Sequence, residues 1–263
     1  MASTLVKAII FQAKNVKAFT AWLKRFSSID NSLLLEIDEE HSRFTSKSYN
    51  DERSVVKMSS INFDDAGLVT VTKPGKDTKR IKVGIFNISR LIKIIDQFND
   101  AEFSITINYD EVIGDDSITN YAGKDIQFKN KNLKMSVDCT SLNIFKYITD
   151  ELFKGSISVI ESIGEFELTK ANIEKINSLC VLDNEHKFME FKFKDKEVLV
   201  AGKSFELVLG DKKDVADAAL NIFKDQYANV DVENYNVELG EDRLVFRSID
   251  SETVCVISMA VDK

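Results

Sequence analysis

Residues 14–26, KNVKAFTAWLKRF, carry four basic side chains and no acidic one: Lys14, Lys17, Lys24 and Arg25. The chain of 263 residues has 43 Asp and Glu against 35 Lys and Arg, and a formal net charge of -8. On a helical wheel Lys17 and Lys24 fall within about 20° of each other, and the other two lie within about 80° of Lys17. The segment therefore predicts an amphipathic helix whose outer face can bind phosphate groups by charge, without reading bases.

Two further predicted helices, residues 88–98 and 170–182, repeat this pattern more weakly. In the second of them Glu174 lies four residues from Lys170 and can pair with it. A surface helix can also carry lysines simply because its outer face is solvated, and that reading stays open for each helix taken alone. The candidate DNA-binding residues are Lys14, Lys17, Lys24, Arg25, Arg90, Lys93, Lys170 and Lys175.

The elements that position these helices follow one order, which occurs twice. A strand at residues 5–12 precedes a helix at 15–29, and several segments rich in β-branched and aromatic residues follow it. The helix at 88–98, with Asn87 as its N-cap, separates these strands from a further set. From Gly164 the same order begins again.

This repeat has a period of roughly 150 residues and predicts two domains of similar fold. We place the first domain at 1–140, a connector at 141–163 and the second domain at 164–263. Many short antiparallel strands with two helices per copy predict an α+β fold in which the helices share one face of the sheets.

Signatures of catalysis are weak in this sequence. The tripeptide GKS at 202–204 is not a phosphate-binding loop, because Glu197 stands where that loop needs a glycine. The two histidines, His41 and His186, form no metal-binding motif. We expect a protein that is not an enzyme and that needs no cofactor or metal.

Two alternatives stay open. The pairs Asp64–Asp65 and Asp115–Asp116 could bind Mg²⁺ in a nuclease, although acidic pairs beside a glycine are more often solvated turns. A β-rich viral protein that binds single-stranded nucleic acid or regulates transcription would need exposed aromatic rings for stacking. The periodicity instead predicts core positions for the aromatic side chains Phe19, Trp22, Phe26, Phe103, Phe191 and Phe193.

Cysteine usage and hydropathy indicate an intracellular protein. Cys139, Cys180 and Cys255 are odd in number and far apart, which is typical of a reducing compartment. No apolar run approaches the roughly 18 residues of a membrane-spanning helix, and the N-terminus has no export signal. We therefore expect a cytoplasmic protein without a membrane contact.

Three long stretches carry a resemblance to a known family. FTAWLKRFSSIDNSLLLEI has the pattern of an apolar helix that ends in a short turn before a Leu/Ile-rich strand. GIFNISRLIKIIDQFNDAEFSITI has the pattern of a strand, a second helix, a turn and a strand. The third stretch has the pattern of a strand, a loop, a strand, a short helix and a strand: SFELVLGDKKDVADAALNIFKDQYANVDVENYNVELGEDRLVFRS. Together they resemble DNA sliding clamps, in particular the two-domain, ring-forming clamps of T-even-like bacteriophages.

This resemblance implies a head-to-tail ring, a homotrimer, with the helices on its inner wall and antiparallel sheets outside. Such a ring encircles duplex DNA, tethers the replicative DNA polymerase and is served by a clamp loader. A bacteriophage clamp would act in the cytoplasm of its host cell.

The resemblance also implies two contact sites. Clamp subunits join an edge strand of one first domain to an edge strand of the next second domain, and residues 131–139 and 204–210 hold these positions in the pattern. Their alternating apolar side chains are Leu133, Met135, Val137, Phe205, Leu207 and Leu209. A pocket for partner peptides is implied at Phe145, Ile148, Leu152, Phe153, Met259 and Val261. The alternative for residues 145–153 is a strut over the interdomain core.

Overall fold

A computed structural model describes residues 7–73, 80–98, 102–113, 119–145, 150–159, 161–212 and 216–260. The chain divides into two compact units. The first comprises Met1–Ser48 and Ser59–Ile148, and the second Tyr49–Met58 and Thr149–Lys263. Among the described residues, no helix has the length and apolar character needed to cross a membrane.

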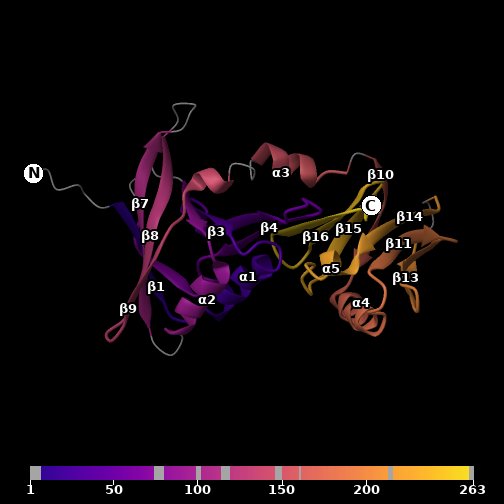
Figure 1. Cartoon of the computed structure of the whole chain (residues 1–263), viewed down its shortest axis with the longest axis horizontal. Coiled ribbons are helices and arrows are strands. Elements are labelled where there is room, and N and C mark those ends of the chain that lie inside the picture. The colour runs from indigo at the N-terminus through magenta and orange to yellow at the C-terminus, as the bar shows by residue number, and fades with distance from the viewer. Residues whose placement is uncertain are drawn as a thin grey trace, which may run out of the picture. The chain divides into compact units, whose positions relative to one another are not determined.

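The first unit has two helices on one face of a mostly antiparallel sheet (Figure 1). Its strand order is β4-β3-β2-β6-β8-β7-β1-β5, and β9 pairs with β8. Its elements are β1 (Lys7–Ala13), α1 (Lys17–Ser27), β2 (Leu33–Asp38), β3 (Arg43–Tyr49), β4 (Val55–Asn62), β5 (Leu68–Thr72), β6 (Arg80–Ile85), α2 (Ile88–Asp96), β7 (Phe103–Ile113), β8 (Thr119–Lys129), β9 (Lys134–Asp138) and the 3-10 helix η1 (Leu142–Phe145).

The core of this unit forms where the apolar stripes of α1 and α2 meet the sheet. Phe19, Leu23 and Phe26 of α1 are buried, as their helical spacing predicts. Trp22 is also buried, and its indole N–H donates to Ser59 Oγ over 3.0 Å. The Asn87 side chain caps α2 by accepting from the backbone N–H of Arg90 over 2.7 Å, so the predicted N-cap is confirmed.

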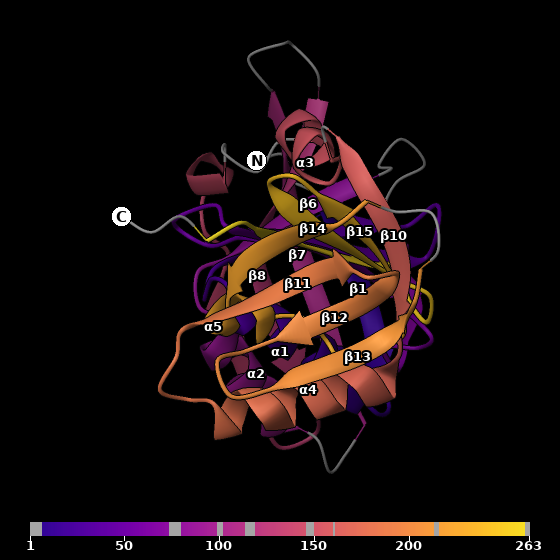
Figure 2. The same ribbon diagram turned by 90° about the vertical axis from the view of Figure 1, so that its right-hand side faces the viewer.

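The second unit contains two sheets and the helix α4. One sheet has the order β13-β12-β11-β14, and Figure 2 shows α4 running along it. The other has the order β10-β15-β16-β17 and continues to the Val55–Met58 part of β4, which belongs to this unit. Its elements are α3 (Asp150–Ser156), β10 (Ser162–Leu168), α4 (Lys170–Leu182), β11 (Phe188–Lys194), β12 (Glu197–Ala201), β13 (Glu206–Asp211), β14 (Ala218–Phe223), α5 (Lys224–Tyr227), β15 (Tyr235–Gly240), β16 (Arg243–Ser248) and β17 (Thr253–Ser258).

The two copies of the sequence pattern correspond element by element. In the first copy β1, α1, β2–β4, β6, α2 and β7–β9 follow one another, and in the second β10, α4, β11–β13, β14, α5 and β15–β17 do the same. β5 has no counterpart among the described elements of the second copy. The predicted α+β fold with two repeated domains is confirmed.

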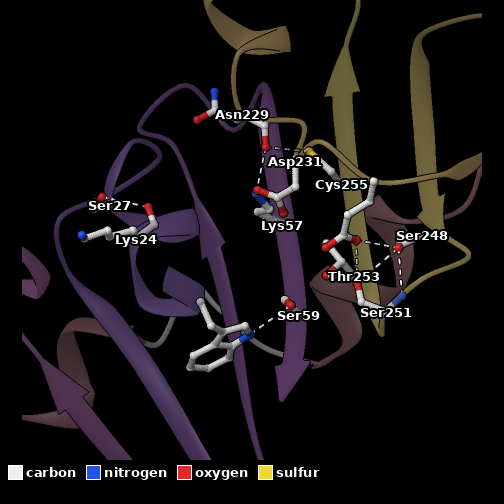
Figure 3. Close-up of polar contacts among 12 residues, drawn as sticks. Lys24, Ser27, Lys57, Ser59, Asn229, Asp231, Ser248, Ser251, Thr253 and Cys255 are labelled. Atoms are coloured by element: carbon white, nitrogen blue, oxygen red, sulfur yellow. Dashed lines mark hydrogen bonds and ion pairs between the residues drawn. The ribbon is translucent and has the colours of Figure 1, made fainter. Parts of the chain in front are cut away.

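A buried ion pair lies inside the second unit (Figure 3). Lys57 is fully buried, and its Nζ donates to Asp231 Oδ1 and to the carbonyl oxygen of Asn229, each over 2.8 Å. The buried Cys255 thiol lies 4.0 Å from the same carbonyl, and burial raises its pKa to about 12, so it stays neutral. The ion pair fastens the segment after α5 to β4.

Removing one partner of this pair is expected to cost more stability than removing both. Asp231→Ala leaves the Lys57 ammonium buried without that carboxylate, and we expect the free energy of unfolding to fall by roughly 3–5 kcal/mol. Adding Lys57→Met to that variant removes the buried charge and should restore most of the loss. Urea denaturation of the two variants measures both values, and equal stabilities would contradict this expectation.

Candidate nucleic-acid interface and edge strands

α1 and α2 pack against each other and present a basic outer surface in the first unit. Lys17 and Lys24 of α1 and Arg90 and Lys93 of α2 are exposed, opposite the buried apolar stripes. α1 contains no acidic residue, and α2 contains Asp96 in its last turn. We call these four side chains the basic surface. Exposed cations on neighbouring helices can contact a phosphate backbone by charge alone.

Two of the predicted DNA-binding residues, Lys14 and Arg25, lie outside the basic surface. Lys14 is exposed but lies before α1, in the turn where its backbone N–H donates to Gly67 O over 3.2 Å, so its predicted position on the helical wheel is wrong. The helix begins later than predicted because Val16, which is buried, is its N-cap residue. Arg25 is on α1 but half-buried.

The corresponding helices of the second unit are less basic. Lys170 and Lys175 are exposed on α4, but Glu174 is exposed between them, and Lys170 lies near enough to Asp250 to contribute to lowering the pKa of that carboxyl. The larger contributions to that shift are hydrogen bonds from Asn234. α5 is a single turn. The helices of the second copy therefore carry a smaller excess of basic residues than those of the first copy, as the sequence indicates.

Lys224, at the start of α5, is held by Asp183 at the C-terminal end of α4. Its Nζ lies 2.7 Å from Asp183 Oδ2, and the same buried carboxylate accepts from Ser204 Oγ over 2.7 Å and from the backbone N–H of Lys203 over 3.1 Å. These bonds connect α4 and α5 to the turn that leads into β13. Sequence reasoning missed this cluster because its members are up to 41 residues apart and form no local motif.

This cluster should make stability depend on pH at the acid end. The hydrogen bond from Lys224, followed by that from Ser204, holds the pKa of Asp183 well below its usual value of 3.8. A lowered pKa in the folded state adds stability that is present above the unfolded-state value and is lost as pH falls through the folded-state value. We therefore expect Asp183→Asn to lower Tm at pH 7, and the difference from the natural chain to shrink below pH 4. A difference that is the same at pH 3 and pH 7 would contradict this assignment.

The two strands predicted to join subunits, β9 and β13, are both edge strands. Among the described elements, β9 pairs with β8 alone and β13 with β12 alone. Met135 and Val137 are half-buried and pack against the core of the first unit, whereas Leu133 is exposed. Phe205, Leu207 and Leu209 are half-buried, and Val208 between them is 51% exposed.

Of the residues predicted to form a peptide pocket, the structure describes the side chains of Phe145, Phe153 and Met259. Phe145, in η1, is buried in the first unit, and Phe153, in α3, is buried in the second, where its ring packs 6.4 Å from that of Tyr49. Met259 is exposed after β17. Ile148, Val261 and the side chain of Leu152 lie outside the described residues.

Some of the residues considered for metal chemistry lie in the described ranges. Asp64 and Asp65 are exposed in the turn between β4 and β5, while Asp115 and Asp116 lie outside the described residues. His41 shares a hydrogen bond of 2.9 Å with Asp38. Within the ranges that the structure covers, no group of three His, Cys, Asp or Glu side chains could hold a metal ion.

No protein-family model matches this sequence, and no curated protein matches it. Solved structures do match. The Helicobacter pylori beta clamp bound to a DNA ligase peptide superposes with a TM-score of 0.66 at 11% identity, over 99% of this chain and 67% of that one. A. fulgidus PCNA with the C-terminal region of FEN-1 gives 0.61 at 10% identity, over 97% and 99% of the two chains. PCNA from Entamoeba histolytica gives 0.60 at 15% identity, over 98% and 100%. The chain therefore has the fold of DNA sliding clamps, and the resemblance to these proteins found in its sequence is confirmed.

Proposed function

We propose that this chain is a DNA sliding clamp that encircles duplex DNA and tethers a replicative DNA polymerase. The observation that carries the proposal is the basic surface: exposed Lys17, Lys24, Arg90 and Lys93 lie on two adjacent helices of a chain whose net charge is -8. Such a surface binds phosphates without sequence preference. The acidic remainder of the chain repels DNA elsewhere, so contact is confined to the helices and the clamp can slide.

The proposed assembly is a head-to-tail ring of three copies, each with domains at 1–140 and 164–263 joined by residues 141–163. The alignments with the two PCNA chains cover nearly all of this chain and nearly all of each PCNA chain, which supports a subunit of similar size. Lys14, Arg25, Lys170 and Lys175 would supplement the basic surface on the inner wall. β9 and β13, through Leu133, Met135, Val137, Phe205, Leu207 and Leu209, would join the subunits.

A polymerase and other replication proteins would bind this ring, and a clamp loader would open it. Two of the similar structures are clamps with a DNA ligase peptide or a FEN-1 segment bound, which supports a peptide-binding role here. Met259, with Ile148, Leu152 and Val261, remains our proposed contact region for such peptides. The other two residues of the predicted pocket, Phe145 and Phe153, are buried. The proposed clamp catalyses no reaction and acts in the cytoplasm, that of the host if the source is a bacteriophage.

A single-strand binder is a weaker candidate because it stacks bases on exposed aromatic rings. All 18 phenylalanines are among the described residues, and Phe86 is the one that is exposed. Trp22 is buried. Among the described Phe, Tyr and Trp side chains, this single exposed ring does not form a stacking platform.

The mass of the assembly in solution tests the proposed ring. Native mass spectrometry is expected to show a species of three times the 29.8 kDa of the chain. A ring can dissociate at low concentration, so the measurement is repeated up to the concentration at which the mass stops changing. A stable monomer that still supports processive DNA synthesis would overturn the proposal.

A further inference from the structure

We infer the register of the contact between two copies of this chain: β9 of one copy lies antiparallel to β13 of the next, with Met135 directly opposite Leu207. The inference rests on the proposed ring and goes beyond it by stating which residues meet. The predicted opposed pairs are Lys134–Val208, Met135–Leu207, Ser136–Glu206, Val137–Phe205 and Asp138–Ser204.

The second unit already contains one contact of this kind. There the Val55–Met58 part of β4 lies beside β17, and the backbone N–H of Ser258 donates to the carbonyl oxygen of Ser54 over 2.8 Å. The end of β17 thus meets the start of β4, so the two strands are antiparallel and Ser54 is opposite Ser258. β4 closes the run β2–β3–β4 of the first copy, and β17 closes β15–β16–β17 of the second. By the repeat, β13 and β9 hold the equivalent places.

Equivalent turns align β13 with β4. The backbone N–H of Asn50 donates to Val55 O over 3.2 Å before β4, and that of Gly202 donates to Phe205 O over 2.9 Å before β13. Each bond closes the turn that leads into its strand. Phe205 therefore corresponds to Val55, and Ser204 corresponds to Ser54.

Equivalent bonds align β9 with β17. The backbone N–H of Thr140, two residues after Asp138, donates to Gly84 O of β6 over 2.9 Å. The backbone N–H of Ala260, two residues after Ser258, donates to the carbonyl oxygen of Asn221 over 2.8 Å, and Asn221 lies in β14, the counterpart of β6. Asp138 therefore corresponds to Ser258. Transferring the contact between Ser54 and Ser258 places Ser204 opposite Asp138.

Counting along the strands from this pair brings apolar side chains together. Phe205 meets Val137, and two residues further Leu207 meets Met135. The next apolar residue of β13, Leu209, lies at a β-bulge in the ladder with β12, so the regular count ends at Val208. The register was transferred from backbone bonds alone, and the match of these two apolar pairs on one face agrees with it.

The backbone groups that face outward on the two edges, away from the paired described strand, also agree with this register. On β9, the bonds from Asn130 N–H to Leu133 O and from Cys139 N–H to Lys124 O fix the alternation of the ladder with β8. Residues Lys134, Ser136 and Asp138 then direct their backbone groups away from β8. On β13, the bond from Gly202 to Phe205 likewise leaves Ser204, Glu206 and Val208 directed away from β12. The inferred register places these two sets opposite each other, and a shift by one residue would not.

Disulfide formation between copies tests this register. The background variant is C139A/C180A, and Cys255 is retained because it is fully buried. Met135 and Leu207 would form a pair without mutual backbone bonds, about 4.5 Å apart at Cα, which a disulfide can bridge. The matched control M135C/F205C places the cysteines two residues out of register, roughly 8 Å apart, beyond that reach. On mild oxidation we expect M135C/L207C to form at least about tenfold more intermolecular disulfide than the control.

Two outcomes overturn the inference and separate it from the proposed ring. If native mass spectrometry shows the ring but M135C/F205C cross-links as well as M135C/L207C or better, the register is wrong and the ring stands. If every variant and the natural chain stay monomeric and no disulfide forms, both are wrong. V137C/F205C, with V137C/L207C as its control, repeats the test should M135C/L207C fail to give the thermal melt of the background variant.

Discussion

Replacing Lys17 and Lys24 by glutamate is expected to weaken binding of the chain to duplex DNA by at least about tenfold at 0.1 M salt. Both side chains are exposed on α1. Loss of two phosphate contacts should also lower the slope of log K against log salt concentration by about 1.8. Adding R90E/K93E should double that change, because these residues complete the basic surface. Fluorescence anisotropy with labelled duplexes at several salt concentrations gives both quantities.

The matched control for this prediction is K129E/K194E. It changes the net charge by the same amount, but Lys129 and Lys194 are exposed on strands β8 and β11 rather than on the helices. We expect its slope to equal that of the natural chain. Exposed substitutions of this kind change stability by about 0.5 kcal/mol or less, so thermal melts should stay the same. Equal losses of affinity in both variants would mean that net charge, and not the basic surface, governs DNA binding.

Proline at Ser136 or Val208 is expected to release monomers from the proposed ring. Both residues direct their backbone N–H away from the neighbouring strand of their own chain, so proline there removes a bond between copies and spares the ladder inside each copy. Proline at Met135 would instead break the ladder with β8. We expect a loss of roughly 1–3 kcal/mol per contact, about 5- to 150-fold in Kd. Sedimentation equilibrium over a range of concentrations measures this change.

Thr70→Pro is the matched control for the proline variants. Thr70 lies on β5, which pairs with β1 alone among the described strands, and the bond from Lys14 N–H to Gly67 O places the N–H of Thr70 on the outer side of that ladder. This edge takes no part in the proposed ring. Dissociation by T70P as strong as that by S136P or V208P would contradict the assignment of β9 and β13.

The elements of the fold could be predicted because each has a local signal. Helical spacing of Phe19, Leu23 and Phe26 marks α1, and Asn87 marks the start of α2. α4 occupies Lys170–Leu182, the range that its sequence pattern predicts. The alternation of Leu133, Met135 and Val137 predicts a strand with one apolar and one solvent-exposed face. In the structure this strand, β9, is an edge strand.

The features that sequence reasoning missed depend on contacts between distant segments. Asp183 and Lys224 look like ordinary surface charges until α4 and α5 bring them together. Lys57 occupies a strand position that alternation alone would expose, and its burial depends on Asp231, 174 residues away. We predicted a peptide pocket at Phe145 and Phe153 because apolar residues in a connector can be accessible to a partner. Both side chains are instead buried in their units. Pairing between remote residues has no period that a single sequence reveals.

Retention on DNA with blocked ends tests the central claim most directly. The chain is mixed with a linear duplex blocked at one end, the second end is then blocked, and the complex is washed with 1 M salt, where the Debye length is about 3 Å and phosphate contacts are screened. A ring that encircles the duplex should stay on the doubly blocked DNA and leave within minutes when a restriction enzyme cuts it. Complete loss in the wash, with or without blocked ends, from a chain that native mass spectrometry shows to be a trimer under the same conditions, would contradict the claim that this protein encircles DNA.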